Sequence, residues 1–169
     1  LENGAQLARK YLKEHGIYLI IERHLPGTHL DGAAMKAADG KPLIALTLRY
    51  DRLDNFWFTL FHELAHVALH LNTSKNSVFL DDLEYRNVDT PEKEADRWAE
   101  NALIPPDSWR KLRRTRSLSP FKIRKFANEL MISPAIAVGR LRRERNNYRL
   151  LANMVGSGEV RKQFGMNKS

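Results

Sequence analysis

The stretch FHELAHVALH, residues 61–70, places three histidines and a glutamate among phenylalanine, leucine, alanine and valine. Buried histidine and glutamate cost free energy unless they are hydrogen-bonded or bind a metal ion. On a helix, His62 and His66 share one face, so both imidazoles can reach the same ion. Glu63 is rotated by one residue and lies beside that ion. The spacing H-E-x-x-H is typical of zinc hydrolases, in which two histidines bind Zn²⁺ and the glutamate is the general base.

Such a site predicts hydrolysis at a carbonyl group. Zinc lowers the pKa of a bound water from about 16 to about 7 and polarises the carbonyl that the water attacks. Glu63 would take the proton of the metal-bound water during this attack. The alternative is a set of hydrogen-bonded core histidines in a long helix. For a single histidine that alternative would be preferred, but the complete spacing of His62, Glu63 and His66 favours the metal site.

A zinc site needs a third protein ligand, and the absence of cysteine from the sequence leaves histidines and carboxylates. The histidine candidates are His24, His29 and His70. His70 continues the same helix face, but it lies two turns, roughly 12 Å, along the axis from His62. That separation is too long for two bonds of about 2 Å to one ion. We therefore interpret His70 as a residue behind the ligands, a substrate contact or a residue at the edge of the core.

The next predicted helix, within TPEKEADRWAENALIPP (residues 90–106), offers carboxylates for the same site. Glu92 and Asp96 are four residues apart and point the same way. One carboxylate can coordinate zinc while the other accepts the remaining N–H of a ligand histidine. We predict Glu92 as the third ligand and Asp96 as that acceptor, with Glu94 as the main rival of Glu92. The alternative is a solvated acidic first turn that complements the helix dipole.

These side chains must be positioned by two neighbouring helices and a scaffold. The sequence predicts the first helix over residues 55–71, with Asp54 as its N-cap and apolar residues on nearly every face, which is typical of a central, buried helix. A helix within residues 2–16 and strands at residues 17–21 and 42–50 come before it. Asp39-Gly40 predicts a hairpin turn, and a short strand is expected at Val78–Leu80.

The C-terminal part of the chain is basic. Residues 1–100 carry 12 Lys and Arg against 16 Asp and Glu, whereas residues 101–169 carry 16 against 4. Helices opened by Ser-Pro are predicted at residues 120–130 and 134–145, with the spacing of a helix-turn-helix. Because no arginine lies at the start of the second helix, its arginines fit phosphate contact better than base reading. These arginines are Arg140, Arg142, Arg143 and Arg145.

The favoured interpretation is that this helix pair completes the first domain, with its arginines solvated or paired with acidic residues, and contact with nucleic acid or an acidic partner is the alternative. The resulting division has a first domain at residues 1–107, a basic helical subdomain at residues 108–149 and a tail at residues 150–169. This tail either docks back or frays.

Length and composition bound the class of protein. The chain has 169 residues, and its apolar content of 43% is enough for a hydrophobic core. No apolar run reaches the ~18 residues that span a bilayer, and no signal peptide opens the sequence. We therefore expect a soluble, cytoplasmic protein with no membrane partner. Because the sequence starts at Leu1 rather than at methionine, we also expect it to be part of a longer chain.

The stretches FTLFHELAHVALHL and EKEADRWAENALIPP together resemble the ImmA/IrrE family of zinc metallopeptidases. The pattern of this family is H-E-x-G/A-H, followed by E-x-x-A-N/D-x-F-A and then L-[MIL]-P. Trp98 stands where the family usually has phenylalanine, and Asp96 takes a place often held by asparagine. The resemblance extends less strictly from about residue 33 to Pro106, and loosely into the C-terminal helices.

The resemblance implies a gluzincin-like site, with the metal ligands and base already named and with Asp96 behind a ligand. The implied fold is zincin-like α+β, in which the H-E-x-x-H helix packs against a small antiparallel or mixed sheet and a basic helical subdomain follows. An edge strand of that sheet, expected at Pro42–Arg49, would hold the substrate as an added strand. The candidates for stabilising the oxyanion are Tyr50, Tyr85 and His70.

The predicted function is that of a zinc-dependent endopeptidase that cuts an intracellular protein substrate by Glu63-assisted attack of metal-bound water. The resemblance makes a transcriptional repressor one candidate substrate. The alternative is a peptidase-like domain of a DNA-binding regulator or antitoxin with little or no proteolytic activity. The basic C-terminal half would then contact nucleic acid.

Overall fold

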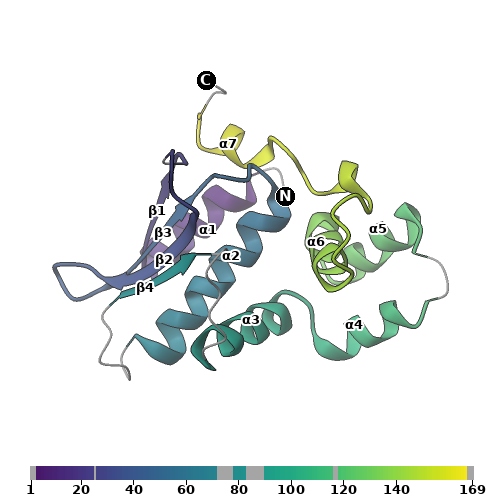
Figure 1. Cartoon of the computed structure of the whole chain (residues 1–169), viewed down its shortest axis with the longest axis horizontal. Coiled ribbons are helices and arrows are strands. Elements are labelled where there is room, and N and C mark those ends of the chain that lie inside the picture. Colours follow the sequence, from purple (N-terminus) through teal and green to yellow (C-terminus); the bar gives the residue numbers. More distant parts are fainter. Residues whose placement is uncertain (1–2, 25, 72–77, 83–89, 116–117, 167–169) are drawn as a thin grey trace.

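The structure is a computed structural model of the whole chain (Figure 1), and it describes residues 3–24, 26–71, 78–82, 90–115 and 118–166. Its elements along the chain are α1 (Gly4–Glu14), β1 (Tyr18–Glu22), β2 (Leu30–Lys36), β3 (Pro42–Thr47), α2 (Leu53–Ala65), the π-helix η1 (His66–His70), β4 (Val78–Asp82), α3 (Thr90–Leu103), α4 (Pro106–Arg113), α5 (Pro120–Glu129), α6 (Pro134–Glu144), the 3₁₀-helix η2 (Ala152–Met154) and α7 (Glu159–Gln163). The predicted α+β class is confirmed.

Within the described residues, the sheet has four strands in the order β1-β3-β2-β4. β2 pairs antiparallel with β3 and β4, whereas β1 pairs parallel with β3, so the sheet is mixed. The predicted hairpin is the β2–β3 connection, in which Gly40 has a φ of +82°, a left-handed conformation that glycine adopts without strain. The strand expected at Val78–Leu80 is β4, with Ala34 of β2 opposite Phe79.

The prediction that Pro42–Arg49 forms an edge strand is wrong. β3 lies inside the sheet, with Ala33 of β2 opposite Ala45 on one side and Ile20 of β1 opposite Ala45 on the other. The reason is burial: β1 brings Leu19 and Ile21 into the core, and the parallel pairing with β3 is what holds it there. The edges of the sheet are therefore β1 and β4.

α2 runs across the middle of the molecule and contacts the sheet, α3, α6 and α7 (Figure 1). The prediction that Asp54 is its N-cap is wrong, because the helix begins two residues earlier than predicted, at Leu53, with Arg52 in the cap position. The Asp54 carboxylate instead accepts hydrogen bonds from Arg52 Nε at 2.9 Å and Nη2 at 3.2 Å. From His66 the helix widens into the π-helix η1, which ends at His70.

The first hydrophobic core lies between α1, the sheet, α2 and α7. Buried Leu12, Ile44, Phe56 and Val160 belong to this core. The described part of the tail at residues 150–169 therefore docks back, which is one of the two predicted outcomes. Its last helix is tied to the first one, because Gln163 Oε1 accepts a hydrogen bond from the backbone N–H of Ala5 at 2.8 Å.

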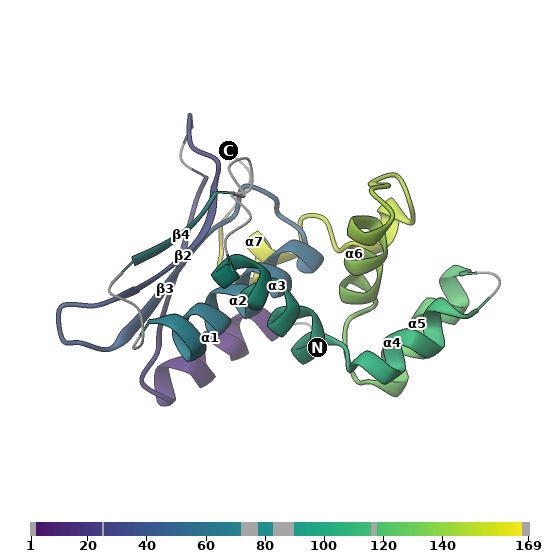
Figure 2. The ribbon, with the colours of Figure 1, turned by 60° about the horizontal axis from the view of Figure 1, so that its bottom comes forward.

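The second hydrophobic core joins α4, α5 and α6 beyond the C-terminal end of α3 (Figure 2). The predicted helices at residues 120–130 and 134–145 are α5 and α6, whereas α4 was not predicted. Pro105 and Pro106 end α3, and Pro106 also opens α4, because proline fits the first turn of a helix. The buried side chains of this core include Ile104, Trp109, Ile123, Val138 and Leu141.

The predicted domain boundaries near residues 107 and 149 stay predictions. No helix in the described ranges combines the length and the apolar character that crossing a membrane requires.

Candidate metal centre

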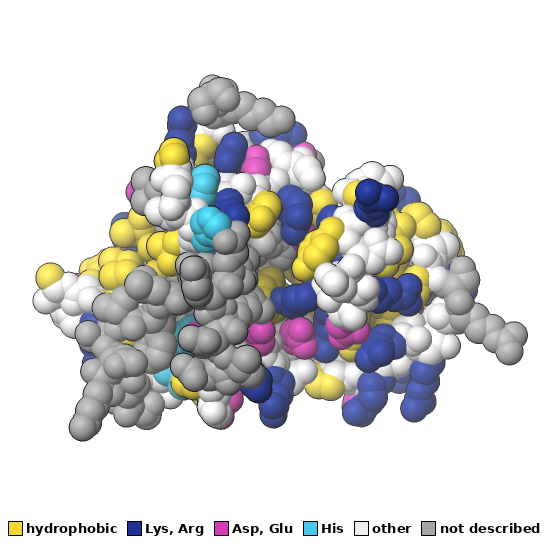
Figure 3. All heavy atoms as spheres, viewed as in Figure 1, with side chains coloured by type: hydrophobic (Ala, Val, Ile, Leu, Met, Phe, Trp, Pro, Cys, Tyr) yellow, Lys and Arg dark blue, Asp and Glu magenta, His cyan; other side chains and the backbone are white. Residues whose placement is uncertain are grey.

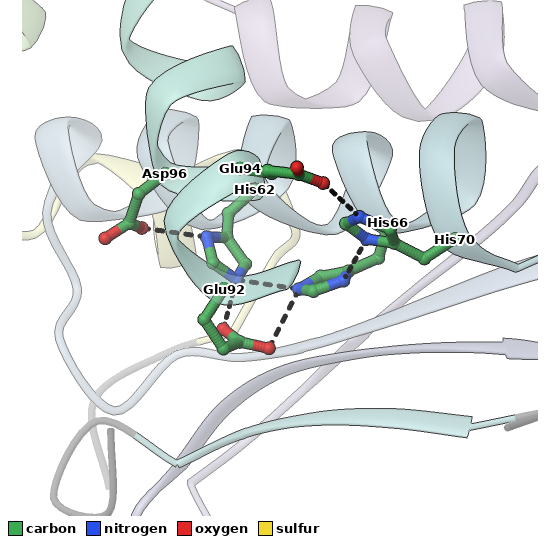
Figure 4. Close-up of polar contacts among 6 residues, drawn as sticks. All are labelled: His62, His66, His70, Glu92, Glu94 and Asp96. Carbon is green, nitrogen blue, oxygen red and sulfur yellow. Dashed lines mark hydrogen bonds and ion pairs between the residues drawn. The ribbon is translucent and has the colours of Figure 1, made fainter. Parts of the chain in front are cut away.

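Three side chains from α2, η1 and α3 converge on one point (Figure 4). Nε2 of His62 lies 3.0 Å from Nε2 of His66 and 3.0 Å from Oε2 of Glu92. Nε2 of His66 lies 3.2 Å from Oε1 of Glu92. Atoms that bind one tetrahedral zinc ion at about 2 Å lie roughly 3.3 Å from one another. The spacing therefore fits a site in which His62, His66 and Glu92 could hold a metal ion, and these three side chains are called the ligand group below.

The close packing of α3 on α2 brings Glu92 to the two histidines. Ala95 and Ala99 are fully buried on α3, and their small side chains allow the two helices to approach closely. Trp98 lies with its ring centroid 6.2 Å from that of Phe61 on α2. The first turn of α3 consequently lies over the H-E-x-x-H segment.

Asp96 lies behind His62, on the side away from Glu92. Its Oδ1 is 3.0 Å from Nδ1 of His62. If Nδ1–H donates to this carboxylate, Nε2 keeps its lone pair for a metal ion. Asp96 therefore lies at hydrogen-bonding distance from His62, where the sequence predicted an acceptor for the second N–H of a ligand histidine.

His66 has a comparable arrangement behind it, formed by His70 and Glu94 (Figure 4). Nδ1 of His66 lies 3.1 Å from Nδ1 of His70, and Nε2 of His70 lies 3.2 Å from Oε2 of Glu94. With Nε2 of His66 turned to the ligand group, its Nδ1–H donates to His70, and His70 Nε2–H donates to Glu94. His70 thus lies behind a ligand, and Glu94, the predicted rival of Glu92, lies beside His70.

The charge state of Glu92 suits metal binding. Burial raises the pKa of its carboxyl group, but the hydrogen bonds to His62 and His66, together with the charges of these residues, outweigh burial and lower the pKa well below its ordinary value. Glu92 is therefore ionised at neutral pH. Metal ions bind the deprotonated form of a carboxylate, so no proton has to be displaced from this side chain.

Glu63 is fully buried between α2 and β2. A Cβ atom added to Gly32 of β2 would lie 2.4 Å from Oε1 of Glu63 and 2.8 Å from Cγ2 of Thr59. Only glycine therefore leaves room for the Glu63 carboxylate against the strand. Sequence reasoning did not single out Gly32, although a glycine inside a strand is a known signal of close approach by another group.

Other candidates named from the sequence lie outside the ligand group. His24 and His29 do not belong to it. Tyr50 is exposed next to the start of α2, with the guanidinium carbons of Arg49 and Arg52 at 5.3 and 5.4 Å from its ring centroid. Tyr85 lies outside the described residues. No oxyanion stabiliser is assigned.

Three of the four arginines that were considered for phosphate contact interact inside the protein. Arg140 pairs with Glu100 at 3.4 Å and with Glu144 at 3.2 Å, and Arg143 pairs with Glu100 at 3.3 Å. Arg142 is 5% exposed and donates a hydrogen bond to the Tyr148 carbonyl oxygen. Figure 3 shows acidic side chains flanked by lysine and arginine side chains across the middle of one face. Of the four, Arg145 is the exposed one, and nucleic-acid contact stays a prediction.

Comparison with models of protein families gives a match over residues 12–142, which is more than half of the chain. The matched region includes the sheet, both helices that supply the ligand group, and most of α6. Comparison with curated proteins gives no match. The extent of the family match, together with the paired H-E-x-x-H and acidic segments, shows that the chain belongs to the Peptidase_M78 family, described as the IrrE N-terminal-like domain.

Proposed function

We propose that this peptidase-like domain is a zinc-dependent endopeptidase of zincin-like fold that hydrolyses a peptide bond in an intracellular protein. The observation that carries the proposal is the convergence of two imidazole nitrogens and one carboxylate within 4.8 Å of one another, next to the position of Glu63 in the sequence of α2. Two nitrogen ligands and one carboxylate form the ligand set of many catalytic zinc sites, which keep one position open for water or substrate.

The residues of the site have distinct tasks in this reaction. His62, His66 and Glu92 would hold the zinc ion, which supplies a lowered pKa for a bound water and polarises the substrate carbonyl. Glu63 would take a proton from the attacking water and deliver it to the leaving amide nitrogen. Asp96 and His70 would hold the two ligand imidazoles in the required tautomer and orientation.

The outer edge of β4 is the place that we propose for the substrate backbone. β4 is an edge strand of the sheet, and its ribbon passes beneath the ligand group in the close-up view (Figure 4). An extended peptide could add to this edge through backbone hydrogen bonds, which would lay its peptide bonds along the strand. A transcriptional repressor is the substrate that we propose to test first.

A substitution that separates metal binding from catalysis tests this function. Glu63→Gln should keep the zinc content of the protein but slow peptide cleavage by roughly 10²- to 10⁴-fold, because the general base is lost. His62→Ala and Glu92→Ala should lower the zinc content itself. Metal analysis and cleavage of a peptide library, read by mass spectrometry, measure both properties, and Glu14→Gln on exposed α1 is a matched control.

Full cleavage activity of the Glu63→Gln protein would contradict the proposed mechanism. Regulation of a target gene that survives this substitution would favour the alternative function, a regulator in which the domain acts without proteolysis.

A further inference from the structure

A cavity of about 330 Å³ opens between α2, α3 and α6. Two of its lining residues, Phe58 and Thr59, lie one helical turn before His62 and Glu63 on α2. The ring centroid of Phe58 is 6.1 Å from that of His62. Thr59 and Glu63 both lie against Gly32 of β2. A substrate residue next to the bond that is cut would therefore have this cavity within reach.

Arginines line the side of the cavity formed by α6 and by the residue before α2. Arg52, Arg140 and Arg143 all line it, together with two acidic residues, Asp54 and Glu100. The guanidinium carbon of Arg143 lies 3.4 Å from the ring centroid of Phe58. Because Phe58 in turn lies against His62, its ring connects Arg143 to the ligand group. Arg143 pairs with Glu100 through Nη2 at 3.3 Å, and its guanidinium has five N–H donors in all.

Positive charge is in excess around this cavity. Arg142 lies on α6 between two residues that line the cavity, Arg140 and Arg143. Its Nε and Nη1 atoms have no hydrogen-bond acceptor among the described residues. Burial, and after it the charge of Arg52, lower the pKa of Arg142. A further cation in the cavity would add to this repulsion, whereas an anion would relieve it.

Apolar side chains form a second part of the cavity wall. Leu103 of α3, Ile104 directly after it and Ile136 of α6 line the cavity together with Phe58. An aspartate or glutamate side chain matches both the apolar wall and the arginine-lined wall of the cavity. Its methylene groups would contact the apolar side chains, and its carboxylate would reach the guanidinium groups. Charge-assisted pairs between arginine and carboxylate are among the strongest hydrogen bonds in proteins.

We propose that this cavity binds an acidic side chain of the substrate beside the scissile bond, and that Arg143 is the residue that selects it. The proposal rests on the proposed peptidase function and names its substrate class. It assigns Arg143 of α6 to substrate recognition, in place of the phosphate contact that the sequence offered as an alternative.

Cleavage of a peptide library tests the selection. The zinc-loaded chain is incubated with peptides made by trypsin digestion of a proteome, and the residues flanking each new cut are read by mass spectrometry. We expect aspartate and glutamate to be enriched at one position next to the cut. In Arg143→Met, which keeps the length of the side chain but removes its charge, this enrichment should fall at least about tenfold. Arg145→Met, on the exposed end of the same segment, should leave it unchanged.

A binding measurement separates this proposal from the proposed function. The Glu63→Gln protein is titrated with N-acetyl-Gly-Glu-Gly-amide or with its glutamine counterpart, and the Nε–H signals of ¹⁵N-labelled arginines are followed by NMR. The glutamate peptide should shift the Arg143 signal in a saturable way, with the Arg145 signal unmoved. The glutamine peptide should bind at least about tenfold more weakly. Arg143→Lys, which keeps the charge, should retain part of the difference if Arg143→Met fails to fold.

The two measurements separate failure of the pocket from failure of the peptidase function. A chain that cuts no peptide but prefers the glutamate probe contradicts the peptidase function and supports the acidic pocket. Equal binding of both probes, or an acidic preference that Arg143→Met leaves intact, overturns the pocket even if cleavage is efficient.

Discussion

At the scale of single residues, each ligand histidine has a partner on the nitrogen that faces away from the ligand group. Asp96 lies 3.0 Å from Nδ1 of His62, and His70 lies 3.1 Å from Nδ1 of His66. A carboxylate is an acceptor in its ionised form, whereas His70 can accept only as the tautomer that carries its proton on Nε2. Glu94, 3.2 Å from that nitrogen, favours this tautomer.

Removing the His70 imidazole should therefore weaken metal binding without touching a ligand. We expect His70→Ala to raise the zinc dissociation constant by roughly 10- to 100-fold, which is the usual effect of losing a partner of a ligand histidine. Competition with a chromophoric chelator measures this constant. His15→Ala is the matched control, because His15 lies at the C-terminal end of α1 and stacks on Tyr11. An unchanged zinc affinity of His70→Ala would show that the contact with His66 has no influence on the site.

Most of the site could be predicted at this scale, because helix geometry alone puts residues four apart on one face. The spacing predicted the convergence of His62 and His66, and it placed Glu92 and Asp96 on a common face. The partner of His66 could not be predicted, since it depends on the π-helix and on Glu94 from another element. Gly32 was missed for a similar reason: its neighbour Glu63 is distant in sequence.

At the scale of elements, the approach of α6 to α2 depends on Gly139. A Cβ atom at this position would lie 2.5 Å from Cβ of Asp54 and 2.9 Å from its Oδ2. Asp54 has little room to move, because it is 7% exposed and its carboxylate is held by Arg52. The absence of a side chain at residue 139 is therefore a condition for the packing of the two helices.

Gly139→Ala sets two effects of opposite sign against each other. Helix propensity alone would stabilise the protein by about 1 kcal/mol. The overlap with Asp54 should cost more, since overpacking costs roughly 1–3 kcal/mol and the atoms in the way belong to a restrained side chain. We expect a net fall in the free energy of unfolding, measured by urea denaturation. An increase of about 1 kcal/mol in the free energy of unfolding, which is the propensity value, would contradict this expectation. It would show that α2 and α6 can move apart at no cost in free energy.

The errors made at this scale have a common physical origin. Local patterns identified the strand at residues 42–47, but they do not say which strands lie beside it, because pairing between β1 and β3 is a long-range choice. The pair Pro105-Pro106 was interpreted only as the end of a helix, although proline is also favoured in the first turn of a helix, where Pro106 begins α4. Asp54 has the residue type of an N-cap, yet the competing interaction with Arg52 engages its carboxylate.

At the scale of the whole molecule, the last helix contributes to a core that the first half of the chain builds. Val160 of α7 is fully buried among residues of α1, the sheet and α2. Asp51, just before α2, accepts hydrogen bonds from the backbone N–H groups of Val160 at 3.1 Å and Arg161 at 3.0 Å. The family match ends at residue 142, so this helix lies beyond the matched region but inside the same core.

Val160→Ala should consequently destabilise the whole protein. Loss of two buried methyl groups should lower the free energy of unfolding by roughly 2 kcal/mol. In a chain of this length, that change corresponds to a fall of about 4–8 °C in the thermal midpoint, which scanning calorimetry measures. Lys162→Ala in the same helix is the control, because its side chain is 70% exposed. Equal thermal midpoints of the two variants would show that α7 does not contribute to the stability of the core.

The contact between Gln163 and Ala5 also has a mechanical consequence. This hydrogen bond links residues near opposite ends of the sequence. Tension applied to the two ends would therefore first act on the seam, the contact between α1 and α7. The load would reach α2 and its histidines only after that seam had opened. An experiment that stretches single molecules should therefore show a first rupture that is insensitive to zinc and a later one that zinc strengthens.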